Sequence, residues 1–157
     1  MNEITIEQRI QRLEDIEAIK TLKHTYAFHC DNGYDANSLA PLFTEDAVWD
    51  GGGLGVNKGR EAIREFFSAS PAMVPFAVHY LTNPIIEIDG DKAKGKWFLW
   101  EPMVFSEGNQ AVWMSAQYSD EYVKINGEWM FNNVKIDIHM LSPYEDGFAK
   151  TRNLLEA

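Results

Sequence analysis

Four strand-like segments separated by three short turns fill the second half of the chain and constrain its fold more than any other feature. The segments cover residues 77–88, 92–105, 110–125 and 128–141, and the turns between them are 89-DGD-91, 106-SEGN-109 and 126-NG-127. Asn-Gly between two such segments is a strong hairpin signal, because both residues accept the positive φ angles of a tight turn. Short hairpin turns join antiparallel neighbours, so this half predicts an antiparallel meander.

The first half of the chain predicts helices. Apolar residues recur at three- and four-residue steps from residue 6 to about residue 29, as on an amphipathic helix; they are Ile10, Leu13, Ile16, Ile19, Leu22 and Tyr26. Asn32-Gly33 is a typical stop for such a helix. The next expected elements are a short helix over residues 36–42, a strand over residues 47–49, and a second helix that begins at Asn57 or Gly59 and is ended by Pro71 and Pro75.

Helices followed by a long meander predict an α+β fold in which the helices cover one face of the sheet. The 157 residues fit a single domain, residues 1–157. The glycine-rich stretch 51-GGGLG-55 lacks the GK[ST] ending of a phosphate-binding loop, so we interpret it as a flexible hairpin.

Charge and cysteine content exclude several classes of partner. The chain has 24 acidic and 14 basic residues, a formal net charge of -10, which repels nucleic acid and anionic lipid. Cys30 is the only cysteine, which excludes an internal disulfide and fits a reducing compartment. The sequence lacks the continuous apolar run of a signal peptide or of a membrane span. We therefore expect a cytoplasmic protein that binds neither nucleic acid nor membrane.

The stretch 24-HTYAFHCDNG-33 gathers several reactive side chains at the end of the first helix. Residues three or four apart share a helix face, so His29 points away from Asp31, and His24 lies roughly 10 Å from Asp31 along the axis. The spacing does not suit a metal ion, since no two histidines stand four residues apart. Asp31 opposes the helix dipole, and this cost favours a stabilising cation or a functional role for its carboxylate.

Strand alternation places one carboxylate among apolar residues. In residues 92–105 the more apolar face carries Ala93, Gly95, Trp97, Leu99, Glu101, Met103 and Phe105, and we expect this face to contact the helices. Because burial of an unpaired charge is costly, Glu101 is expected at a cavity or near the wet end of its strand. His79 lies in an apolar strand-like segment, where a histidine is more often structural than catalytic. The residues alone leave both roles open for His79.

Several segments together resemble the SnoaL-like family of the nuclear-transport-factor-two-like superfamily. Residues 15-DIEAIKTLKHTY-26 with Asp31, and 79-HYLTNPIIEIDGDKAKGKW-97, are similar to the bile-acid 7α-dehydratases. Residues 43-FTEDAVWDGGGLGVNKG-59, 107-EGNQ-110 and 119-SDEYVKINGEW-129 are similar to the hexachlorocyclohexane dehydrochlorinases. Scytalone dehydratases are more distant relatives. The resemblance implies a cone-shaped α+β fold in which a curved antiparallel sheet and N-terminal helices enclose a deep pocket.

The same resemblance implies an elimination catalysed without a cofactor. Family members use an Asp–His dyad, whose positions match Asp31 and His79 here. The dehydratases also have a pocket tyrosine, which matches Tyr26, whereas the dehydrochlorinases have a lysine at that position. Glu101 falls where the bile-acid enzymes have an aspartate. The arginine that relatives carry on the last strand is absent from 134-VKIDIHML-141. Lys135, Asp137 and His139 lie nearby on one face of that strand, and the sequence does not decide which of them takes its place; Lys135 and His139 are kept as substrate-binding candidates. Further substrate-binding candidates, chosen for their large apolar side chains, are Trp49, Trp97, Met103 and Trp113.

The function predicted from the sequence is a cofactor-independent lyase, a dehydratase or dehydrohalogenase, for a hydrophobic cyclic small molecule. An isomerase or cyclase with the same dyad, a non-catalytic ligand-binding or oligomerisation module, and a small dioxygenase subunit remain alternatives, because fold does not fix function. The resemblance also implies a homodimer or homotrimer. Phe98 and Trp100, on the outer face of the sheet, would suit its interface.

Overall fold

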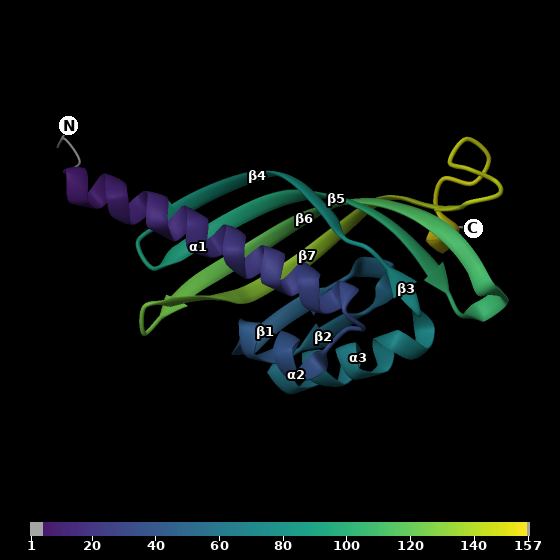
Figure 1. Ribbon diagram of the computed structural model, residues 1–157, viewed down its shortest axis with the longest axis horizontal. Coiled ribbons are helices and arrows are strands. Elements are labelled where there is room, and N and C mark those ends of the chain that lie inside the picture. The colour runs from purple at the N-terminus through teal and green to yellow at the C-terminus, as the bar shows by residue number, and fades with distance from the viewer. Residues whose placement is uncertain (1–4, 157) are drawn as a thin grey trace.

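The computed structural model describes residues 5–156. A long helix, α1 (Ile6–Asp31), lies across one face of a curved sheet, and the shorter helices α2 (Ala36–Leu39) and α3 (Arg60–Met73) lie near its C-terminal end (Figure 1). Short 3-10 helices occupy Ala40–Leu42, Gly52–Leu54, Glu107–Asn109 and Leu154–Glu156. The predicted α+β fold, with N-terminal helices against a curved sheet, is confirmed.

Within the described residues the chain forms one seven-stranded sheet in the order β2-β1-β7-β6-β5-β3, with β4 also paired to β5. The strands are β1 (Phe43–Asp50), β2 (Val56–Lys58), β3 (Phe76–Ala77), β4 (Tyr80–Asp89), β5 (Lys92–Phe105), β6 (Gln110–Ile125) and β7 (Glu128–Pro143). Strands β4 to β7 form the predicted antiparallel meander. The β1–β7 pair is parallel, which makes the sheet mixed.

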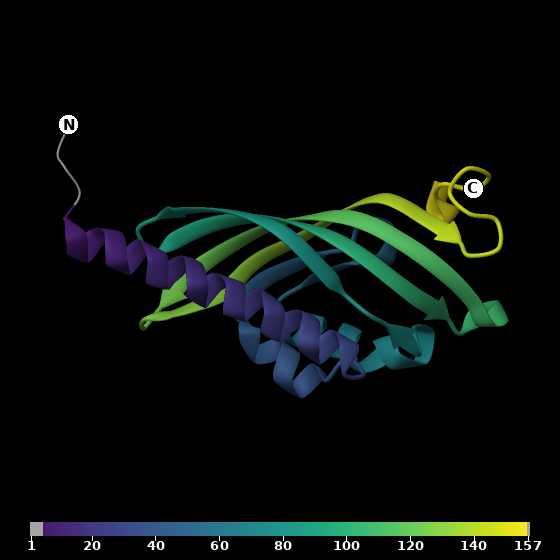
Figure 2. The ribbon, with the colours of Figure 1, turned by 45° about the horizontal axis from the view of Figure 1, so that its top comes forward.

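Only the C-terminal half of α1 packs against the sheet. A capping box starts α1, since the Thr5 hydroxyl accepts from the Gln8 N–H and the Gln8 side chain accepts from the Thr5 N–H. Its predicted apolar stripe is buried only in the second half of the helix, whereas Ile6, Ile10 and Leu13 are exposed. Both ribbon views show why, because the N-terminal turns of α1 project beyond the sheet (Figures 1 and 2).

Helix α3 begins after Gly59 and ends at Met73, between the two prolines that were predicted to end it. Pro71 lacks one N–H donor, and the Val74 N–H still donates to the Ser70 carbonyl. One predicted boundary is wrong. The strand expected over residues 77–88 is broken into β3 and β4, which both pair with β5 and leave His79 in the gap between them.

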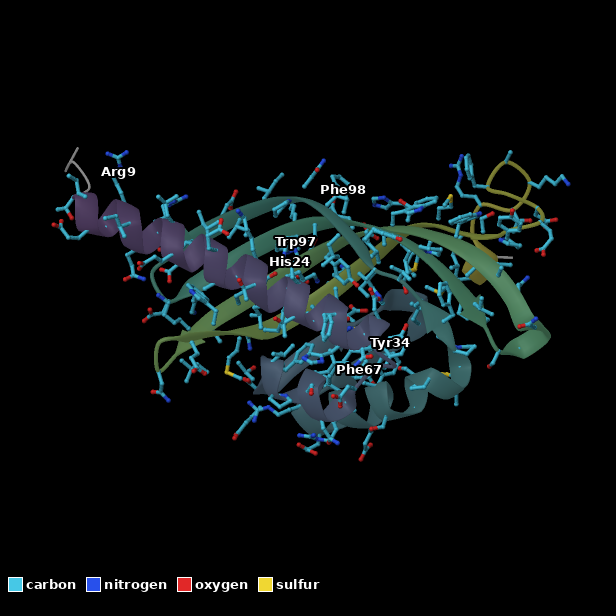
Figure 3. All side chains as sticks on the ribbon, viewed as in Figure 1. Arg9, His24, Tyr34, Phe67, Trp97 and Phe98 are labelled. Carbon is cyan, nitrogen blue, oxygen red and sulfur yellow. The ribbon has the colours of Figure 1, made fainter. Side chains whose placement is uncertain are left out.

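The alternation predicted for β5 is confirmed. Ala93, Trp97, Leu99, Glu101 and Met103 are buried, while the side chains between them, from Lys94 to Trp100, are exposed. Figure 3 shows the consequence, with Trp97 beside His24 on the side of α1 and Phe98 on the other face of the sheet. The inner face of β5 thus supplies both core packing and the carboxyl group of Glu101.

Candidate active site

A cavity of about 140 Å³ lies between the C-terminal end of α1, helix α3 and the inner face of β5 and β6. Its walls are largely apolar and include Leu54, Phe66, Phe67, Met103, Phe105 and Met114. The polar residues that line it are Ser70, His79, Glu101 and three tyrosines, together with the indole of Trp49. A dry apolar pocket with a few convergent polar groups is the usual form of a small-molecule site.

A wider depression of about 1180 Å³ lies near the β4–β5 and β6–β7 turns. Among the described residues that line it are surface charges such as Glu87, Lys94 and Glu121, and no histidine. The smaller cavity instead gathers a histidine, a buried carboxyl group and tyrosines between apolar walls, so it is the candidate active site.

Three elements bring Asp31, His79 and Glu101 together at one wall of the cavity. The Oδ1 atom of Asp31, the last residue of α1, lies 2.7 Å from His79 Nδ1 and accepts a second hydrogen bond from the His79 backbone N–H at 2.9 Å. These two hydrogen bonds offset the cost of a carboxylate at a helix C-terminus. On the other side of the ring, His79 Nε2 lies 3.4 Å from Glu101 Oε1.

This geometry fixes the tautomer of the histidine. A carboxylate only accepts hydrogen bonds, so Nδ1 carries the proton of neutral His79 and Nε2 keeps its lone pair. The lone pair faces the cavity and Glu101. The arrangement can therefore hold a base at Nε2 with a carboxyl group beside it.

Burial and mutual charge set the proton affinities of this cluster. Burial raises the pKa of Glu101 to about 7, the nearby Asp31 charge adds to the shift, and His79 opposes it. Burial lowers the pKa of His79, but the charges of Glu101 and Asp31 outweigh it, so that the net shift is upward. The pKa values of both residues are thus raised, and the 3.4 Å contact allows a proton to pass between His79 Nε2 and Glu101.

Three tyrosines also line the cavity. The Tyr26 oxygen accepts a hydrogen bond from Trp49 Nε1 at 3.0 Å. The ring of Tyr34 meets His79 edge-on at 6.3 Å between centroids and stacks on Phe67 (Figure 3). The Tyr118 hydroxyl has no hydrogen-bond partner within the described chain. Burial raises the pKa of each tyrosine, so all three remain protonated donors.

Comparison with protein families matches residues 11–135 to the SnoaL-like domain. The chain belongs to this family. It is 29% identical over 127 residues to γ-hexachlorocyclohexane dehydrochlorinase of Sphingobium indicum, covering 78% of this chain and 80% of the relative. The crystal structure of a type 2 hexachlorocyclohexane dehydrochlorinase matches with a TM-score of 0.81 at 27% identity, over 86% of this chain and 92% of that one. A Novosphingobium aromaticivorans protein, provisionally described as an aromatic ring hydroxylase, matches with a TM-score of 0.77 at 32% identity, over 85% and 96% of the two chains. The resemblance predicted from the sequence is thus confirmed.

Five of the predicted site residues of this SnoaL-like protein line the cavity, namely Tyr26, Trp49, His79, Glu101 and Met103. Asp31 does not line the cavity and contacts His79 at Nδ1, on the side of the ring away from Glu101. Cys30 is buried and lies outside the lining. Among residues 5–156 no three histidine, cysteine, aspartate or glutamate side chains are placed to hold a metal ion, and no helix is long and apolar enough to span a membrane.

Four predicted substrate-binding residues do not line the cavity. Trp97 is buried under α1, where its Nε1 donates to the Tyr122 hydroxyl at 3.0 Å. Trp113 alternates with the buried Val112 and Met114, so it lies on the outer face of β6 and stacks on Trp100. Lys135 and His139 are exposed on β7. Val134 and Ile136, on either side of Lys135, are buried and take the inner positions of the strand. Neither replaces the family arginine inside this cavity.

The sequence analysis missed Tyr34 and Lys23. Tyr34 follows the helix stop, where positive φ angles at Gly33 (76°) and Tyr34 (52°) turn the chain back over the cavity. Helix periodicity offered the signal for Lys23, which lies four residues after Ile19 and three before Tyr26 on the buried face of α1. A lysine at that position predicts a buried partner for its charge.

Proposed function

We propose that this SnoaL-like protein is a cofactor-independent lyase that removes water or halide from a small, hydrophobic, cyclic molecule through an Asp31–His79 dyad. The observation that carries the proposal is the 2.7 Å contact between Asp31 and His79 Nδ1 beside an apolar cavity. The similarity to hexachlorocyclohexane dehydrochlorinases supports the same reaction class.

In the proposed step, neutral His79 accepts a proton from a substrate carbon at Nε2. The electrons of the C–H bond form the new double bond, and the leaving group departs with its bonding pair. Asp31 holds the ring in the reactive tautomer and stabilises the imidazolium that forms.

Glu101 supplies a proton when the leaving group is an oxygen. A pKa of about 7 keeps a large fraction of this carboxyl group protonated near neutral pH. Proton transfer from Glu101 to the departing hydroxyl releases water and leaves Glu101 charged. The proton on His79 then crosses the 3.4 Å contact to Glu101 and restores the starting state. A halide leaves without a proton, so Glu101 has no acid role in dehydrohalogenation.

The cavity also limits the size of the substrate. Its volume of about 140 Å³ resembles that of an engineered apolar cavity of about 150 Å³ that holds benzene. One six-membered ring therefore fits without rearrangement. Tyr26 is the candidate donor to a carbonyl or a leaving oxygen on that ring.

The proposal is tested with two probes, γ-hexachlorocyclohexane for halide release and 3-hydroxycyclohexanone for water release. Loss of the base or of its orienting carboxylate, in His79→Ala or Asp31→Asn, is expected to lower kcat by about 10²- to 10⁴-fold. The matched control is His24→Ala, which alters an exposed histidine outside the cavity. Turnover that survives both site changes at the wild-type rate would contradict the dyad.

An isomerase or cyclase remains the second candidate, since the His79–Glu101 contact also allows a proton to return to a different carbon. Product analysis separates the two, because an isomerase releases neither water nor halide. Binding of both probes without conversion would instead support a non-catalytic ligand-binding module.

We also propose that the protein is cytoplasmic and assembles as a homodimer or homotrimer. The support for assembly is an aromatic patch on the outer face of the sheet, in which Trp113 stacks on Trp100 at 5.3 Å and contacts Tyr144 at 5.8 Å between centroids. Tyr80 and Phe98 extend this patch and are also exposed.

A further inference from the structure

The Tyr118 hydroxyl is a buried polar group that the proposed chemistry has not yet used. Tyr118 is fully buried, lines the cavity, and its hydroxyl has no hydrogen-bond partner in the part of the chain that the structure describes. A buried hydroxyl that lacks a partner loses the hydrogen bonds it makes in water. An acceptor atom on a bound molecule would restore one of them.

A lysine lies directly behind this tyrosine. Lys23 of α1 is fully buried, and its Nζ lies 3.3 Å from the centroid of the Tyr118 ring. At this position the ammonium contacts the electron-rich face of the ring, an interaction that strengthens where water is excluded. A positive charge there also stabilises negative charge that builds up on the phenol oxygen as it donates a proton toward an acceptor.

Asp120 holds the lysine in place. Its Oδ2 forms an ion pair with Lys23 Nζ at 2.8 Å and accepts a hydrogen bond from the Tyr122 hydroxyl at 2.9 Å. Tyr122 in turn accepts from Trp97 Nε1 at 3.0 Å. This chain of contacts anchors the ion pair to β5 and β6, and thereby fixes the ammonium against the ring of Tyr118.

A contribution to folding stability does not by itself account for the buried Lys23–Asp120 ion pair. A buried ion pair often contributes little more than well-packed apolar side chains of the same volume, because both charges lose their hydration. Asp31 behind His79, and Glu101 once it has given up its proton, repel any negative charge that forms on a substrate. Lys23 is placed to offset that repulsion through Tyr118.

We propose that Tyr118 donates a hydrogen bond to a substrate oxygen that gains negative charge in the reaction, and that Lys23 and Asp120 are positioning residues that strengthen this donor. The inference rests on the proposed elimination and narrows its substrate class. A carbonyl next to the carbon that loses its proton becomes an enolate oxygen, which such a donor stabilises. A chlorinated hydrocarbon has no oxygen for Tyr118 to bind, so the favoured substrate is a cyclic β-hydroxy ketone.

The test uses 4-nitrophenol, whose oxygen is neutral or anionic depending on pH and whose absorbance reports its ionisation. The dissociation constants of its phenol and phenolate forms are measured for each variant. Tyr118→Phe keeps the ring over Lys23 and removes only the hydroxyl, so we expect it to weaken phenolate binding at least tenfold more than phenol binding. Asp31 and Glu101 are present in both proteins, so their repulsion cancels in the comparison.

Lys23→Met/Asp120→Leu removes both charges together, which avoids leaving one unpaired in the core. We expect about a three- to tenfold loss of phenolate preference with Tyr118 still present. The control Tyr80→Phe removes an exposed hydroxyl on the outer face and should leave the preference unchanged. Circular dichroism checks that each variant folds, and Tyr118→Phe alone carries the test if the double variant does not.

Equal phenolate preference in the wild type and in Tyr118→Phe, or failure of the wild type to bind 4-nitrophenol, would overturn the inference. His79→Ala separates this result from the proposed function, because it removes the base and keeps Tyr118. Loss of turnover in His79→Ala with retained phenolate preference supports both proposals. Retained turnover in His79→Ala with the preference still dependent on Tyr118 contradicts the base and leaves the donor supported.

Discussion

The Glu101 carboxyl group is 2% exposed and lies 3.4 Å from His79 Nε2, and burial raises its pKa from 4.5 to about 7. The folded protein therefore binds this proton more tightly than the unfolded chain between those two pH values. The contribution of Glu101 to stability is fully present below pH 4.5 and is lost as the pH rises through 7. His79, whose pKa is also raised, acts in the same direction, since its stabilised charged form is lost above its folded pKa.

We expect the free energy of unfolding to fall more steeply between pH 5 and pH 8 in the wild type than in Glu101→Gln. The difference should be on the order of 3 kcal/mol across this range, because glutamine is neutral throughout. Urea denaturation at several pH values measures it. In Glu101→Gln the Glu101 charge no longer raises the pKa of His79, which removes pH dependence in the same direction. Parallel pH dependences in the two proteins would mean that neither Glu101 nor His79 has a raised pKa.

The positions of three elements decide the stereochemistry of the proposed reaction. Asp31 ends α1, His79 lies between β3 and β4, and Glu101 lies on β5, with which β3 and β4 both pair. The base nitrogen and the acid oxygen therefore stand on the same wall, 3.4 Å apart. Removal of a proton and a hydroxyl from opposite faces of a ring requires groups on both sides of that ring.

We therefore expect syn elimination, with the proton and the hydroxyl lost from one face of the substrate. The measurement uses 3-hydroxycyclohexanone with deuterium at C2, either cis or trans to the hydroxyl. Mass spectrometry of the enone should show loss of the cis deuterium and retention of the trans deuterium. Loss of the trans deuterium would mean that Glu101 and His79 do not act as acid and base in one step.

Features that depend on neighbouring residues along a strand could be predicted from the sequence, whereas features that depend on the pairing between strands could not. Alternation along β5 is a local rule, and it placed Glu101 correctly on the inner face. The same rule applied to β6 would have turned Trp113 outward, but that residue was chosen for its size. Alternation alone could not place His139. A register shift in the β6–β7 pairing leaves this residue between Ile138 and Met140 without a partner on β6.

Long-range contacts were beyond any local pattern. Asp31 and His79 are 48 residues apart, and their pairing was predicted only from the family resemblance. The contact between Lys23 and Asp120 likewise joins a helix to a strand far along the chain. Such pairs depend on how α1 crosses the sheet, which neither segment encodes alone.

At the scale of the whole molecule, the sheet separates the candidate active site from an exposed aromatic patch. Its inner face carries Glu101, Tyr118 and the cavity, and its outer face carries the aromatic patch of Tyr80, Phe98, Trp100, Trp113 and Tyr144. Phe98 and Trp100 remain 47% and 40% exposed in the single chain. Large aromatic side chains that gather on one exposed face favour burial against another chain.

We expect the wild type to form a dimer or trimer through this patch and Trp100→Glu to dissociate it, because burial of an unpaired carboxylate in an apolar interface is unfavourable. Light scattering coupled to size-exclusion chromatography measures the mass. Phe28→Glu, which alters an exposed aromatic residue on α1, is the matched control and should keep the assembly intact. A wild type that elutes with the mass of one chain would contradict the interface. Since Trp100 lies on the face away from the cavity, the dissociated variant should still bind 4-nitrophenol with the phenolate preference of the wild type, provided that each chain holds a complete site.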